Sequence, residues 1–257
     1  MTARRWQRPS WLALGLTLAG IALFTRLGVW QYERMREKQA TLDAVTTILA
    51  ARKPVSLSQA ADSARAGEFD WAAGSGDFAD ADPLLLDNQI RHGRPGVRVY
   101  RQFRPDDASG HPVPDGMLLI DLGWVPLAGD RALPTLPLPV SNPVAVSGLL
   151  APPLSTGVAM GSGIEHRDHA WLLTRMDLAA IARALGSRAL APRVLRLDPT
   201  SPIGYERDLD VLPNTLPPER HLGYAVQWFA LALAALAIFV ILHWRKVADL
   251  ERKQVKK

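Results

Sequence analysis

The chain has 257 residues, of which 48% are hydrophobic and 21% are charged, and it contains no cysteine. This composition is not that of a disordered protein, and the lack of cysteine excludes disulfides, thiolate zinc sites and cysteine-bound iron–sulfur clusters. The net charge of +5 comes from the two ends: residues before 11 and after 244 carry nine basic and two acidic side chains, whereas the middle carries 21 basic and 23 acidic ones. We therefore expect no nucleic-acid partner.

The first apolar run extends from Trp11 to Phe24 and continues to Trp30. A helix over these residues would be about 30 Å long, which is the thickness of a bilayer core. A cleaved signal peptide also begins with basic residues before an apolar centre, but the small-x-small triplet Gly20–Ala22 lies inside the apolar stretch. We expect a retained anchor, with a cytoplasmic N-terminus over 1–10, a first transmembrane helix over 11–32 and a helical or irregular connector over 33–66.

The middle of the chain is expected to be rich in β-strands. Short apolar runs bounded by Pro, Gly, Asn and Asp predict strands at 82–89, 96–103, 117–125, 142–150, 170–176 and 192–198. Arg98 and Arg101 alternate with apolar residues, which suggests one wet and one dry face on that strand, and Trp124 is expected in the core. One helix is expected, with Asp177 as its N-cap and Gly186 as its stop. The expectation is an antiparallel β-rich α+β domain over 67–198.

A proline-rich linker over 199–220 leads to a second apolar run, predicted as a transmembrane helix over 221–244 and followed by a basic tail over 245–257. Six basic residues follow this span, but only Arg207 and Arg220 lie in the approach to it, so the tail is expected in the cytoplasm. The fold class is thus two transmembrane helices that flank a soluble β-rich domain. Both termini would be cytoplasmic and the central domain periplasmic, in a bacterial inner membrane.

Two motifs in the central domain suggest chemistry only weakly. The "GSGDFA" stretch at 74–79 has the spacing of a dinucleotide-binding loop, but its neighbourhood does not read as strand–loop–helix, so we expect a plain turn. His166 and His169 could form a metal pair, yet no further ligand is obvious nearby and a solvated loop is the simpler interpretation. A membrane-tethered metalloenzyme that uses these two histidines stays open as an alternative.

The more unusual side chains lie at the membrane. On a helical wheel, His221, Tyr224 and Trp228 share one face of the second span with small alanines. On the first span, Trp30, Gln31, Arg34 and Lys38 share an arc with Leu27. With both tails inside, the two groups meet at the outer interface. Imidazole can ligate a haem iron, and Arg34 or Lys38 can pair with propionates. The competing interpretation is that these are ordinary interfacial anchors and packing faces.

Several motifs together resemble the Surfeit locus protein 1 family, the assembly factors of cytochrome c oxidase. They are "LGVWQYERMREK" at 27–38, "LLLDNQIRHGRPG" at 84–96, "LLIDLGWVP" at 118–126, the "V-x-G" of 146–148 and "HLGYAVQWFALAL" at 221–233. The similarity extends over nearly the whole chain. Two departures are visible: Asp121 and Leu122 stand where the family usually reads Asn-Arg, and Gln89 stands where it reads Arg.

The resemblance implies a maturation factor, not an enzyme, that supplies or stabilises haem a as it enters subunit I of the oxidase. It implies His221 as the haem iron ligand and, with it, Trp30, Gln31 and Arg34 as matches to the family's site. Together with Tyr224 and Trp228 these form the expected haem-binding set. The expected partners are subunit I, the haem a synthesis machinery and the membrane. The alternatives are a scaffold that stabilises an oxidase intermediate without haem and a divergent paralogue that serves another oxidase.

Overall fold

The computed structural model describes residues 4–6, 9–107, 110–111, 117–129, 132–137, 142–154, 163–186, 190–212 and 215–246. Most of the expected basic tail, from residue 247 onward, lies outside these residues. The chain divides into two compact units, one of Met1–Leu42 with Thr215–Lys257 and one of Asp43–Asn214.

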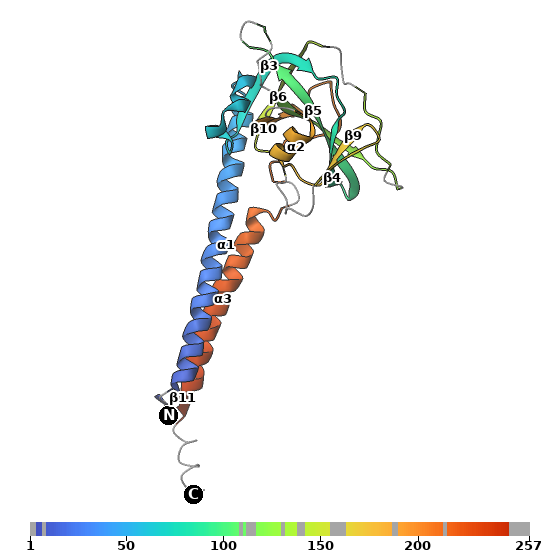
Figure 1. The fold of residues 1–257 in the computed structure, drawn as a ribbon. Helices are drawn as coiled ribbons and strands as arrows, with labels where there is room; N and C mark the ends of the chain where they lie inside the picture. The colour runs from blue at the N-terminus through green and yellow to red at the C-terminus, as the bar shows by residue number, and fades with distance from the viewer. Residues whose placement is uncertain are drawn as a thin grey trace. The chain divides into compact units, whose positions relative to one another are not determined.

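The first unit is a pair of long helices. Helix α1 (Trp11–Ala51) has 41 residues and helix α3 (Pro218–His243) has 26, and both are long and apolar enough to cross a membrane. The two run side by side (Figure 1). At 1.5 Å per residue α1 is about 60 Å long, twice the thickness of a bilayer core, so its charged second half continues the helix beyond the apolar run. The helix therefore passes without a break into the segment expected to be a connector.

The ends of this unit lie together. Strand β1 (Arg4–Trp6) pairs antiparallel with strand β11 (Trp244–Lys246), with Arg5 opposite Arg245. Helix α3 begins where Pro217 serves as N-cap and Pro218 as the first helical residue, a position at which the missing N–H of proline costs nothing. The chain thus enters α1 and leaves α3 at the same end of the helix pair.

The second unit is built on one sheet. Its described strands are, in spatial order, β2 (Val55–Ser56), β3 (Asp70–Phe78), β7 (Val144–Ala151), β10 (Leu190–Leu197), β6 (Met117–Pro126), β5 (Arg94–Pro105), β4 (Leu84–Arg91), β9 (Ala170–Leu173) and β8 (Ile164–Arg167). Two short 3-10 helices, η1 (Leu57–Ala61) and η2 (Ser63–Arg65), precede β3, and helix α2 (Leu178–Ala184) precedes β10. Each of the six predicted strand segments overlaps one of these strands.

The sheet closes on itself through the long strand β5. One edge of β5 pairs with β6 from Gly96 to Phe103. The other edge pairs first with β4 and then, at Phe103–Pro105, with the end of β3. Because β3 also pairs with β7, the strands β3, β7, β10, β6 and β5 form a small closed barrel.

The β-rich character of the domain is confirmed, but the expected antiparallel arrangement holds only in part, because the sheet is mixed. Strand β10 runs parallel to β6, β9 parallel to β4, and β3 parallel to β2. Parallel neighbours need long crossover connections, and the chain between β6 and β10 is long enough to make one through β7, β8, β9 and α2. Helix α2 matches the prediction: the Asp177 side chain accepts a hydrogen bond from the Ala180 N–H at 3.0 Å.

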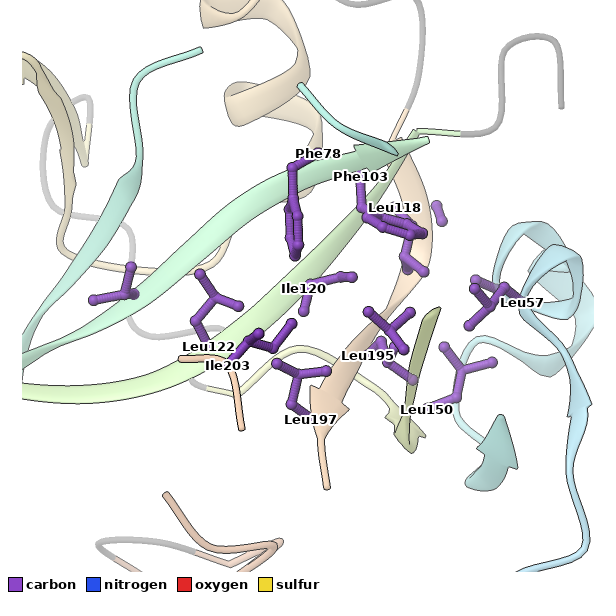
Figure 2. Close-up of a cluster of buried hydrophobic side chains, with 14 of the residues drawn as sticks. Leu57, Phe78, Phe103, Leu118, Ile120, Leu122, Leu150, Leu195, Leu197 and Ile203 are labelled. Atoms are coloured by element: carbon purple, nitrogen blue, oxygen red, sulfur yellow. The ribbon is translucent and has the colours of Figure 1, made fainter. Parts of the chain in front are cut away.

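Apolar side chains fill the interior of the barrel (Figure 2). Phe78 from β3 and Phe103 from β5 meet edge to face, with ring centroids 5.1 Å apart. A second cluster covers the outer face between β5 and α2, where Tyr100, Met176 and Ile181 are buried. Strand β5 is therefore covered on both faces.

This double covering corrects the expectation that Arg98 and Arg101 face water. Arg98 is 6% exposed and Arg101 is 4% exposed. The two terminal nitrogens of Arg101 donate to the backbone carbonyls of Ala81 and Leu136. A period-two pattern shows that alternate residues point to opposite faces, but it does not show which face meets water.

The "GSGDFA" motif is not the expected turn. Residues up to Phe78 belong to β3, and no helix follows as a dinucleotide loop requires. A Cβ atom on Gly76 would lie 2.2 Å from the carbonyl oxygen of Arg104 and 2.8 Å from the Phe103 ring. The glycine therefore allows β3 and β5 to approach closely where the barrel closes.

Candidate functional site

The structure joins the two membrane-level clusters by one hydrogen bond. The Nδ1 atom of His221 lies 2.7 Å from Oε1 of Gln31, and His221 is buried against α1. An amide oxygen can only accept, so Nδ1 of His221 must carry the proton. In the neutral imidazole, a proton on Nδ1 leaves a free lone pair on Nε2.

The second ring nitrogen, Nε2, has no hydrogen-bond partner in the part of the chain that the structure describes. Nε2 of His221 is buried and makes no hydrogen bond within the described part of the chain. An unsatisfied buried acceptor costs about 1–3 kcal/mol, so polar groups in this position usually have a structural or functional reason. A basic nitrogen with its lone pair free, held by a hydrogen bond on the other ring nitrogen, has the form of a metal-ligating histidine.

Aromatic side chains pack between α1 and α3 in the turns of α3 that follow His221. Trp228, two turns after His221, stacks on Phe24 with ring centroids 5.8 Å apart and an angle of 24° between the rings. A Cβ atom on Gly28 would lie 2.7 Å from the Phe229 ring, so the glycine permits the close approach of the helices. Sequence reasoning did not single out Phe24, although it lies seven residues before Gln31 and thus on the same helix face.

Three of the expected site residues do not face the helix contact. Trp30 is 52% exposed and Tyr224 is 40% exposed. Arg34 is also exposed, and its Nη1 atom pairs with Glu37 at 2.7 Å on its own helix. Gln31, His221 and Trp228 therefore lie between the helices, whereas Trp30, Tyr224 and Arg34 flank them on the outer surface.

Lys38 is the second cation of the arc on α1, and its surroundings differ from those of Arg34. Its ammonium donates to the backbone carbonyl of Leu216 at 2.5 Å, just ahead of α3. No carboxylate among the described residues pairs with it, whereas Glu37 neutralises Arg34. Lys38 therefore brings a positive charge, which no carboxylate of the described residues pairs, to the end of the helix pair that carries His221.

The two histidines considered as a metal pair, His166 and His169, lie in different surroundings. His166 lies on β8 and its Nε2 atom contacts the Asp82 carboxylate at 2.7 Å, while His169 lies in the turn to β9 with a φ of 62°. The expectation of a loop over both residues was thus wrong for His166. The described residues contain no group of three or more His, Cys, Asp or Glu side chains that could hold a metal ion.

No curated protein matches the chain in sequence. A model of the SURF1 family does match it, over residues 18–233, which reach from the apolar half of α1 into α3 and include the sheet between them. The matched range contains the histidine–glutamine pair and part of each apolar helix, and it covers most of the chain. This chain therefore belongs to the SURF1 family, a family of assembly factors linked to cytochrome c oxidase.

Proposed function

We propose that this protein binds haem a at the outer membrane interface and aids its insertion into subunit I of cytochrome c oxidase. The observation that carries the proposal is the buried Nε2 atom of His221, which has a free lone pair and no hydrogen-bond partner among the described residues. Membership of an oxidase assembly family supports the same function. The haem a synthesis machinery and subunit I are the proposed donor and acceptor.

The side chains of the helix pair supply the chemical groups that haem a would need. His221 would supply the axial nitrogen, and Gln31 would hold the imidazole in the tautomer that ligation needs. The exposed rings of Trp30 and Tyr224 offer apolar surface on either side. Bound haem a would contribute an iron that accepts the imidazole lone pair and propionates that accept hydrogen bonds from cations.

Access to Nε2 requires the helix contact to open. The atom is shielded from solvent, so a ligand reaches it only after the imidazole turns outward or α1 and α3 part locally. The unsatisfied acceptor, at about 1–3 kcal/mol, destabilises the closed arrangement and so offsets part of the cost of opening. Opening and closing of this contact gives the protein a way to hold haem transiently and release it.

The spectrum of the purified protein tests this function. The full chain would be isolated in detergent from cells that make haem a, and its Soret absorbance and pyridine haemochrome would be measured against protein concentration. A Soret band at a stoichiometric level supports the haem carrier. A haem-free protein that co-purifies with subunit I would instead establish the scaffold alternative.

We expect both termini in the cytoplasm and the sheet unit in the periplasm of a bacterial inner membrane. The β1–β11 pairing supports a common side for the two ends, and the six basic residues after Trp244 favour the cytoplasmic one. A reporter that is active only in the cytoplasm should be active when fused after Lys257 and silent when inserted near Asp107. The reverse pattern of activity would overturn this topology.

Between the two cations on α1, Lys38 should matter more for haem than Arg34. Lys38→Ala is expected to weaken haem a binding by about 10-fold, because one charge-assisted hydrogen bond is worth about 1.5 kcal/mol. Arg34→Ala should change binding by less than about 3-fold, because Glu37 already neutralises this exposed arginine. Spectroscopic titration of both variants with haem would compare them directly, and a larger loss in Arg34→Ala would contradict the assignment.

A further inference from the structure

We propose that the sheet unit carries a separate binding site for a carboxylate group, with Arg98 at its base. The site is a cavity of about 190 Å³ between the β4–β5 hairpin and the segment after β10. It is lined by Gln89, Ile90, Arg91, His92, Arg98, Trp124, Asp208 and Asp210. This site stands independently of haem binding, because all of its residues belong to the Asp43–Asn214 unit.

The sequence brings Arg98 and Trp124 together by strand register. Arg98 on β5 is paired with Trp124 on β6, and both side chains are almost fully buried. The Trp124 indole N–H donates to the Gln89 carbonyl at 2.9 Å, which ties the end of β4 to the same place. Gln89 and Trp124 come from two of the motifs that carried the family resemblance, and haem binding in the helix pair uses neither.

The guanidinium of Arg98 has one carboxylate nearby, but it is not hydrogen-bonded to it or to any other described residue. Its Nε atom lies 3.5 Å from Oδ2 of Asp121, and that oxygen accepts no hydrogen bond from any described residue. The Arg98 side chain donates no hydrogen bond to any described residue, although it is only 7% exposed. A buried guanidinium without acceptors is costly, and its planar fork of N–H groups matches the two oxygens of a carboxylate.

The nearby acids do not complete this partner set. Asp121 is shared with Arg196, whose Nε atom lies 3.7 Å from the same Oδ2 atom. Asp208 pairs with Arg91, and the Asp210 carboxylate accepts from the Leu212 N–H at 2.9 Å. Two buried guanidinium groups thus share the Asp121 carboxylate, and Arg98 has no carboxylate to itself among the described residues.

Arg98 keeps its charge in this environment. Burial alone would disfavour the charged form, but the carboxylate of Asp121, with Tyr100 and Asp208, outweighs burial and raises the pKa of Arg98. Asp208 and Asp210 at the rim would repel a doubly charged phosphate, so the favoured ligand is singly charged. Ile90, which is exposed at the rim, and Trp124 add apolar surface beside it.

Two sources could supply such a group, a free small acid or an acidic side chain of a partner protein. The test would use the full chain in detergent and measure its thermal unfolding with benzoate, and with the blocked peptide acetyl-Gly-Glu-Gly-amide. Benzamide and the corresponding Gln peptide are the neutral controls. At about ten times its Kd, a bound ligand should raise the Tm by about 3 °C.

A rise with benzoate alone would support the site and assign it to a free small acid. A rise with the Glu peptide, with or without benzoate, would support the site and assign it to a protein side chain. Equal shifts with the neutral controls, or no shift with either acid, would overturn the proposal. These comparisons need no mutation, so they hold even if Arg98→Gln fails to fold.

Two variants would then show whether carboxylate binding depends on the Arg98 side chain. Arg98→Lys keeps the positive charge but removes the fork, and it should reduce the affinity for the carboxylate by about 10-fold or more. Arg104→Gln removes an exposed arginine from the same strand and should leave the affinity unchanged. An undiminished affinity in Arg98→Lys would also count against the assignment.

Discussion

Replacing His221 by alanine is expected to remove most of the bound haem a, while the protein still inserts into the membrane in normal amount. An iron bond needs a basic nitrogen in a fixed place, and no other side chain of the helix pair presents one beside Gln31. His221→Tyr should also lose haem, although tyrosine suits a membrane interface. Haem a content would be read by pyridine haemochrome against the protein concentration.

Two further variants separate ligation from general damage. His243→Ala changes the histidine at the other end of α3, whose Nδ1 atom contacts the Phe239 carbonyl at 2.8 Å, and it should bind haem normally. Gln31→Leu keeps the side-chain volume but removes the acceptor that sets the His221 tautomer, and it should weaken haem binding by about 10-fold. Full haem occupancy in His221→Ala would remove this residue from the mechanism and leave the scaffold function ahead.

The position of the candidate site followed from topology, but its internal arrangement did not. Placing both tails on one side is enough to bring residues near 30 level with residues near 221. The rotation of each helix about its own axis depends on packing, here the Phe24–Trp228 stack and the close approach at Gly28. For that reason the wheel grouped Tyr224 with His221, whereas the structure leaves Tyr224 on the outer surface and selects Gln31 as the partner of His221.

In the sheet unit, local patterns located strands better than they described their surroundings. The apolar runs at 84–91 and 117–126 are strands because Leu, Ile and Val favour extended structure between turn residues. Strand β3 was missed because its glycines read as a turn, whereas Gly76 admits the Phe103 ring and the backbone carbonyl of Arg104. Such crowding depends on a partner strand far along the chain.

The same limit explains why the cavity at Arg98 was not predicted. The sequence shows an arginine between two valines, which on an open sheet would be a solvated side chain. It is buried because α2 and the segment carrying Asp208 cover that face, and neither covering follows from the strand's own pattern. Sequence reasoning did note unusual residues at Gln89 and Asp121, and both lie beside Arg98 or its neighbours.

Replacing Trp124 by alanine is expected to destabilise the sheet unit by about 3–5 kcal/mol and to lower the abundance of the protein. Trp124 is 3% exposed, and the change removes both its packing and its hydrogen bond to the Gln89 carbonyl. Trp124→Phe keeps most of the packing and loses mainly the hydrogen bond, so it should cost about 1 kcal/mol.

Ile90→Ala is the matched control for Trp124→Ala, because Ile90 lines the same cavity but is 62% exposed, and its loss should change stability by no more than about 0.5 kcal/mol. Thermal unfolding of the purified chains and immunoblots of membranes would rank the three variants. A loss of abundance only in Trp124→Ala would identify Trp124 as a core residue. Trp124→Ala could instead keep normal abundance and Tm while oxidase assembly fails. The packing of Trp124 would then add little to the stability of the free protein, and Trp124 would be a contact residue for a partner.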